Sequence, residues 1–401
     1  MMAPWQINLL VLWIMQFCAS MGFALSTPFA PYFIQELGVT DLNQVKLWAT
    51  AAAAGAPFSM AIVSPLWGIL ADRYGRKPMV MRATFGASVI LTAMAFSRNA
   101  ATFVALRIGQ GMFSGVSAAA ITLVACNTPN QRLGFALGCF SSAIFSGNMF
   151  GMFIGGFLAD AYGYKNTFII SGILLGFAGM LATAFVKENF QRAPQKSSER
   201  KLSLSERWRA LGPGTLILLL VIWVGIGRRL DGGILPIYIQ ELHGGLEGAS
   251  RWSGVINAAG GFGAIIAGVC GGMIFDRWRP HSLIRIVALG AAIALTAIGM
   301  SSTLPALIPL RFALMLFAAA FDPINNTWIA QITPGNRKGA MFGLDHTAKS
   351  IGMTVGPCLG GIIARAWSTR AVFWFGACHF LLLIPLATLV ARILRNTPQQ
   401  K

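Results

Sequence analysis

Long runs of apolar residues, separated by short polar connections, dominate the pattern of this chain. A helix needs roughly 20 consecutive apolar residues to cross the hydrocarbon core of a bilayer. Runs of sufficient length lie near residues 7–35, 46–70, 78–97, 100–126, 134–159, 166–187, 213–240, 251–275, 281–301, 305–331, 339–365 and 370–393. The pattern therefore predicts an all-α membrane protein with twelve transmembrane helices, and the short connections make sequential helices antiparallel.

The composition indicates that lipid solvates most of the chain. Hydrophobic residues make up 55% of the 401 residues and charged residues only 11%, and the mean hydropathy is +0.65. A water-soluble protein of this length needs far more charge to cover its surface. The first apolar run lacks a basic leading region and is too long for a signal peptide, so we interpret it as the first transmembrane helix.

The net charge of +18 comes from basic residues that gather on one side of the predicted topology. When the N-terminus is placed in the cytoplasm, most basic residues fall in cytoplasmic loops, as the positive-inside rule requires. We therefore predict a multi-pass protein of the cell membrane, a bacterial inner membrane, with both termini in the cytoplasm. Basic patches that bind nucleic acid lie on soluble surfaces. This chain has little such surface, so we expect no nucleic acid partner.

The chain contains two halves with matching sequences. The segment PYFIQELG at residues 31–38 recurs as PIYIQELH at residues 236–243, a shift of 205 positions. The same or an adjacent shift relates Asp72 to Asp276, Arg73 to Arg277, Leu106 to Leu310, Arg107 to Arg311, Arg132 to Arg337, and Gly147, Gly151 and Gly155 to Gly352, Gly356 and Gly360. Parallel repeats with a substrate site between them near the membrane midplane are common in secondary transporters.

One long polar stretch separates the two halves. Residues 187–213 are rich in charge, Pro and Ser, which is typical of a cytoplasmic linker. We therefore predict an N-terminal six-helix bundle over residues 1–187, a linker over residues 188–212 and a C-terminal six-helix bundle over residues 213–401.

The string GILADRYGRK at residues 68–77 lies between the second and third predicted helices. Its acid, Asp72, can accept hydrogen bonds from the N-terminus of another helix, where the helix dipole favours an anion. Gly75 permits a tight turn, and the basic residues can pair with carboxylates or lipid phosphates. The second half keeps Asp276 and Arg277 in the related string GGMIFDRWRP.

The string at residues 68–77 resembles the signature loop of the major facilitator superfamily. The resemblance implies twelve transmembrane helices in two pseudo-symmetric six-helix bundles. It also implies a loop that latches the two halves together when the cytoplasmic side is closed. The gating residues that it assigns, with their counterparts in the repeat, are Gly68, Asp72, Arg73, Gly75, Arg76, Lys77, Arg132, Asp276, Arg277 and Arg337.

Further motifs resemble those of the twelve-helix bacterial drug–proton antiporters. Arg107 and Gln110 in LRIGQGMFSG are similar to a motif of the fourth helix, where Arg107 either influences proton transfer or braces helices. The glycines of the fifth helix resemble the antiporter motif, although Met152 replaces its proline, and the eleventh helix carries the complete pattern. Small residues let helix backbones approach closely. Close helix packing is expected at Gly147, Gly151, Gly155, Gly352, Gly356 and Pro357.

Charged residues inside the apolar runs are few, and each is a candidate for function because a charge in the membrane is costly. A carboxylate whose environment alternates changes its pKa, so Asp231 and Asp322 are predicted to carry protons. Arg228 and Arg229 either pair with these acids or hold an anionic substrate, and a static salt bridge is the alternative. The predicted substrate and proton site contains Arg107, Gln110, Arg228, Arg229, Asp231, Asp322, Asn325 and Asn326.

Near the cytoplasmic end of the eleventh helix, Asp345 and Lys349 are four residues apart. This spacing predicts a local ion pair on one helix face.

The motifs and the buried charges together imply a secondary active transporter that works by alternating access. The first function we expect is proton-coupled efflux of amphipathic small molecules or drugs. The alternative is proton-coupled transport of an endogenous anionic metabolite such as a siderophore, which the arginines of the seventh helix favour.

No nucleophile–base constellation occurs in the predicted spans, so no enzyme is expected. The six cysteines show no metal-ligand spacing. We expect no metal and no cofactor, with a proton gradient as the energy source. The expected partners are the bilayer and a small-molecule substrate, and we expect the protein to be a monomer.

Overall fold

The computed structural model describes residues 3–188, 214–275, 280–332 and 338–396. Most of the predicted linker and the gating candidates Asp276, Arg277 and Arg337 lie outside these residues. The helices are α1 (Pro4–Ser26), α2 (Ala30–Glu36), α3 (Leu42–Tyr74), α4 (Arg76–Met94), α5 (Ala100–Met112), α6 (Val116–Asn127), α7 (Leu133–Phe185), α9 (Gly214–Arg229), α10 (Leu235–His243), α11 (Ala249–Phe275), α12 (Pro280–Met300), α13 (Leu304–Ala319), α14 (Phe321–Ile332), α15 (Lys338–Ala366) and α16 (Thr369–Asn396).

Helix α7 contains two membrane crossings. Its first part runs beside α1, where Gly155 lies against the carbonyl of Leu25. The chain leaves helical geometry at Gly163, whose φ is +80°. It then runs back, so that Lys187, just after α7, bonds to Asn8 near the start of α1. Glycine suits this turn because it has no Cβ to clash at positive φ.

Four other crossings consist of two consecutive helices each, namely α1–α2, α5–α6, α9–α10 and α13–α14. The apolar runs over residues 100–126 and 305–331 gave no sign of a break, and the structure shows one in each. Gly115, with φ +109°, precedes α6. Pro323 lies in the first turn of α14, where a missing N–H is tolerated. The twelve predicted crossings are otherwise present, and by length and composition seven described helical segments are apolar enough to span a membrane.

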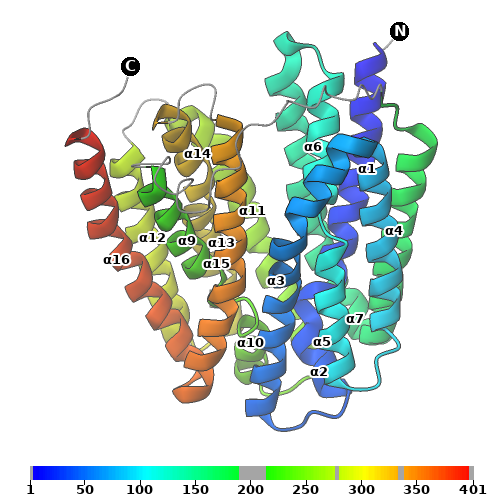
Figure 1. Cartoon of the computed structure of the whole chain (residues 1–401). Coiled ribbons are helices and arrows are strands. Elements are labelled where there is room, and N and C mark those ends of the chain that lie inside the picture. Colours follow the sequence, from blue (N-terminus) through cyan, green and yellow to red (C-terminus); the bar gives the residue numbers. More distant parts are fainter. Residues whose placement is uncertain (1–2, 189–213, 276–279, 333–337, 397–401) are drawn as a thin grey trace.

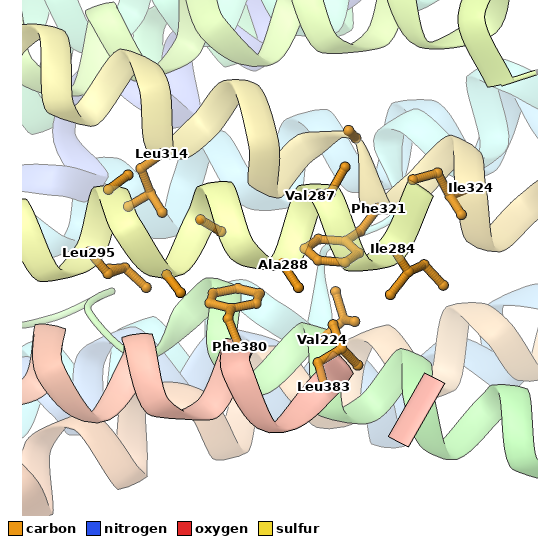
Figure 2. Packing of buried hydrophobic residues seen from close by; sticks show 14 of the residues in the cluster. Val224, Ile284, Val287, Ala288, Leu295, Leu314, Phe321, Ile324, Phe380 and Leu383 are labelled. Carbon is orange, nitrogen blue, oxygen red and sulfur yellow. The ribbon is translucent and has the colours of Figure 1, made fainter. Parts of the chain in front are cut away.

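Each half has a hydrophobic core of its own. One core is made by buried residues between Leu9 and Val186, and the other by buried residues between Ile217 and Val390. Figure 2 shows part of the second core, where Phe321 of α14 and Phe380 of α16 stack with ring centroids 5.6 Å apart. Because each half buries its own apolar side chains, each is a bundle with its own packing.

In each half, a row of glycines in the fifth membrane crossing lets that crossing pack closely against the first. In α7, a Cβ added at Gly147, Gly151 or Gly155 would lie 2.2–2.6 Å from a carbonyl oxygen of α1. The repeat in α15 packs in the same way against α9 and the residues after it. There, a Cβ at Gly356 would lie 2.7 Å from the Ile226 oxygen. Helix backbones can approach this closely because glycine has no side chain.

Figure 1 shows the two bundles side by side, with both termini at one end. The bundles meet mainly through α3 against α15 and α7 against α11. The predicted fold class, twelve transmembrane helices in two pseudo-symmetric bundles, is confirmed.

Candidate functional site

Asp322 lies at the centre of a cluster of charged side chains from three helices. Its carboxylate pairs with Arg228 of α9 at 2.7 Å and with Lys349 of α15 at 3.6 Å. Lys349 also pairs with Asp345 at 2.7 Å, the local pair expected from their spacing. The Asp322 side chain is 40% exposed, and those of Arg228 and Lys349 are 28% and 29% exposed. This cluster is therefore accessible from outside the protein core.

Asp231 forms a second and more deeply buried ion pair. It lies in the turn between α9 and α10, and it pairs with Arg311 of α13 instead of with Arg228 or Arg229. The two side chains are only 8% and 10% exposed. A cavity of about 10 Å³ beside Arg228 and Asp231 has room for about one water molecule. Sequence reasoning missed Arg311 as a site residue, although its repeat relation to Arg107 was a signal.

Arg229 differs from its neighbour Arg228. Its side chain is exposed, and it makes no hydrogen bond or ion pair with any residue that the structure describes. It lies within electrostatic range of Asp231 and Asp322. The base of the side chain is held against α15, since a Cβ added at Gly356 would be 3.0 Å from the Arg229 Cβ. The base of the Arg229 side chain thus lies against α15, and its guanidinium has no hydrogen-bond or ion-pair partner among the described residues.

The N-terminal bundle has one buried cation at the repeat position of Arg311. Arg107 is 6% exposed and donates to Gln110 at 2.6 Å, to Thr27 Oγ1 at 3.3 Å and to the Ala52 carbonyl at 3.3 Å. All of these acceptors are neutral, and no carboxylate among the described residues pairs with it. At the repeat position of Asp231 stands Ser26, so the buried ion pair exists in one half only.

The two predicted asparagines belong to α14. Asn325 is 2% exposed, and its Oδ1 has no hydrogen-bond partner among the described residues. The side chain of Asn326 is outside the described part of the structure.

The described part of the signature loop binds its own half. The carboxylate of Glu188 accepts from the backbone N–H groups of Arg76 and Lys77, each at 2.8 Å, at the start of α4. Lys77 Nζ donates to the Thr183 carbonyl at 2.9 Å. Gly75 has φ +96°, and a Cβ there would be 2.9 Å from Glu188. Sequence reasoning missed Glu188, which stabilises the positive end of the α4 dipole.

The other gating candidates make few contacts in this state. Among the described residues, no atom outside the neighbouring turns of α3 lies within 4 Å of a Cβ added at Gly68, and Arg73 and Arg132 are exposed. The guanidinium of Arg73 lies 5.4 Å from the ring centroid of Tyr74. The side chain of Asp72 is not among those that the structure describes. No hydrogen bond or ion pair joins Arg73, Gly75 or Lys77 to the described residues of the C-terminal bundle.

The opposite end of the molecule, away from the termini, joins the two bundles with hydrogen bonds. Gln35 and Gln240, related by the repeat shift of 205, donate to each other at 2.7 and 2.8 Å. Tyr32 donates to the Pro236 carbonyl at 2.7 Å. These contacts join α2 with α10, at the bottom of Figure 1.

Two cations, at equivalent positions of the two halves, make further contacts between the bundles at this end. Lys46, at the start of α3, reaches the Ala364 carbonyl at 3.4 Å and Glu241 at 3.9 Å. Arg251, at the start of α11, pairs with Asp160 at 3.5 Å. Each cation crosses to the other bundle near the C-terminal end of a crossing, where the helix dipole favours positive charge. Between described residues, the hydrogen bonds and ion pairs that join the bundles all lie at this end.

Replacing Arg251 by Gln is expected to open this end more often. An exposed ion pair contributes roughly 0.2–1 kcal/mol, so the open population should rise by up to about fivefold. The measurement is maleimide labelling of Ala159→Cys, at a position 4% exposed, in a cysteine-free variant in detergent. Lys165→Gln is the control, because Lys165 lies over Phe96 of its own bundle. Unchanged labelling in Arg251→Gln would show that the pair does not hold the end closed.

The fold and the site define a class of protein. Twelve crossings in two repeated bundles, closed at one end around buried charges, are the architecture of a secondary transporter. The family model of the Major Facilitator Superfamily matches residues 12–304 and 232–401, and the chain belongs to this family. The predicted family and the prediction that the chain is a transporter and not an enzyme are confirmed.

Curated relatives cover almost the whole chain. Multidrug resistance protein MdtG of Proteus mirabilis is 32% identical over 99% of this chain and 98% of the relative. Multi-drug resistance efflux pump PmrA of Streptococcus pneumoniae is 30% identical over 92% of each chain.

Solved structures share the fold at lower identity. The nucleoside transporter NupG has a TM-score of 0.79 at 11% identity and covers 96% of this chain and 99% of that one. A bacterial homologue of the human lysosomal transporter Spinster, in an inward-facing and occupied conformation, has a TM-score of 0.78 at 15% identity over 100% of both chains.

Proposed function

We propose that this chain is a proton-coupled exporter of amphipathic small molecules, including drugs, that works by alternating access. The observation that carries the proposal is the near full-length similarity to two proteins named for multidrug resistance and efflux. The accessible acid Asp322, placed between two cations, supports proton coupling. No metal or organic cofactor is part of the proposal, because the proton gradient supplies the free energy.

Asp322 suits proton coupling better than Asp231. Protonation of Asp322 would remove its charge and weaken its pairs with Arg228 and Lys349, which come from other helices. A carboxylate that gains and loses such partners changes its proton affinity between states. Asp231 is more deeply buried with Arg311, and we assign that pair a structural role. Arg107 and Gln110 also belong to the proposed site. Arg107 is its cation in the N-terminal bundle, and the groups that accept its hydrogen bonds, Gln110 among them, are neutral.

We further propose that the protein is a monomer in a bacterial inner membrane, with both termini in the cytoplasm. The positive-inside pattern of the loops supports this orientation. With this orientation, the end at which hydrogen bonds and ion pairs join the two bundles faces the outside. In a state open at that end, the signature loop, with Asp72 and the counterparts in the repeat, would latch the cytoplasmic side.

The test is transport in proteoliposomes with ethidium as the probe. A pH gradient alone should drive uphill movement of ethidium, which is a cation, or of a second amphipathic drug that is an anion, and collapse of the gradient with nigericin should stop it. Liposomes without protein are the control. Failure of the gradient to drive either probe would contradict the proposed function.

A further inference from the structure

In the middle of the C-terminal bundle, the described cations outnumber the described acids. The described cations are Arg228, Arg229, Arg311 and Lys349, and the described acids are Asp231, Asp322 and Asp345. Every one of these acids is in an ion pair, and the cations that pair with them do not include Arg229. Arg107 in the other bundle is a second cation with which no described carboxylate pairs. The acceptors of its hydrogen bonds are neutral. The membrane-embedded part of the described chain therefore carries an excess of positive charge.

Arg229 is the cation placed to receive a ligand. A guanidinium group at the middle of a membrane crossing is costly unless it finds an anion or water. Arg229 is an exposed residue, and its guanidinium has no hydrogen-bond acceptor among the described residues. The base of its side chain lies against α15 at Gly356, so the side chain starts from a fixed point on α9. Guanidinium groups bind the two oxygens of a carboxylate as a matched fork.

We propose that the transport site takes amphipathic anions, with the Arg229 guanidinium binding their carboxylate or a similar acidic group. This inference deepens the proposed export function and rests on it. Bound to Arg229, such an anion compensates the positive charge that the acids of the bundle leave unpaired. A neutral molecule of the same shape leaves Arg229 unpaired and binds more weakly. Because a hydrogen bond to a charged group is stronger than one between neutral groups, the preference should be about tenfold or more.

The experiment compares 1-naphthaleneacetate with 1-naphthaleneacetamide, which share the ring and differ in charge. Binding to the purified full chain in detergent is measured by calorimetry and by the rise in unfolding temperature. The wild type should bind the acetate about tenfold more tightly than the amide. Arg229→Gln should lower acetate affinity to that of the amide, and Arg229→Lys should keep part of the preference. Arg365→Gln is the matched control, because Arg365 is exposed at the end of α15.

Three outcomes would overturn the inference. They are equal binding of both probes by the wild type, no binding of the acetate, and an Arg229→Gln variant that keeps the full preference. Arg229→Lys keeps the inference testable even where Arg229→Gln does not fold. Ethidium transport separates this inference from the function on which it rests. Gradient-driven ethidium transport without acetate binding would refute the anion class and leave the export function intact.

Discussion

Replacing Asp322 by Asn should reduce pH-driven uphill transport to the level of liposomes without protein. The amide keeps the size of the side chain and can bond its neighbours, but it cannot take up and release a proton. Asp322 is the acid that two cations from other helices contact, with a side chain 40% exposed. Because the ion pairs are partly exposed, the unfolding free energy should change by about 1 kcal/mol or less.

Two measurements separate coupling from binding in this variant. Exchange of labelled for unlabelled substrate without a pH gradient should continue, since it needs binding and alternation but no net proton movement. Asp41→Asn is the matched control, because Asp41 is an acid at the start of α3, outside the charged cluster. Uphill transport by Asp322→Asn at the wild-type rate would show that another group carries the proton.

The second large effect is expected on stability, in Asp231→Ala. This change leaves the buried guanidinium of Arg311 without its carboxylate, and Arg311 Nε already has no partner among the described residues. Removal of one member of a buried ion pair costs about 3–5 kcal/mol, because the remaining charge is uncompensated. The measurement is reversible unfolding in mixed detergent micelles.

The double variant Asp231→Leu with Arg311→Met is the control for this effect. Apolar side chains of similar volume often replace a buried ion pair with little loss, so most of the stability should return. A single variant Asp231→Ala as stable as the wild type would mean that water or another group compensates Arg311. Loss of stability in the double variant equal to that in the single one would mean that the charge is not the cause.

Particular residues show why parts of the site could be predicted and others could not. The charges of α9 and α14 stood out because a charged residue in an apolar run is rare and costly. Their pairing was not readable from the sequence: Asp231 contacts Arg311, Asp322 contacts Arg228, and Arg229 contacts neither acid. A counter-ion on another helix depends on how that helix is rotated and broken. The break in the fourth crossing at Gly115 was likewise not predicted.

The twelve crossings and their division into two related bundles follow directly from the amino-acid pattern. Lipid offers no hydrogen bonds to the backbone, so each long apolar run must be a helix, and the repeat of PYFIQELG relates one bundle to the other. Which end is closed became visible once the two bundles were placed beside each other. Lys46 and Arg251 stand at the first positions of two predicted helices, and each pairs across the bundle interface. Such contacts depend on how two separate bundles are placed, and no local pattern encodes that placement.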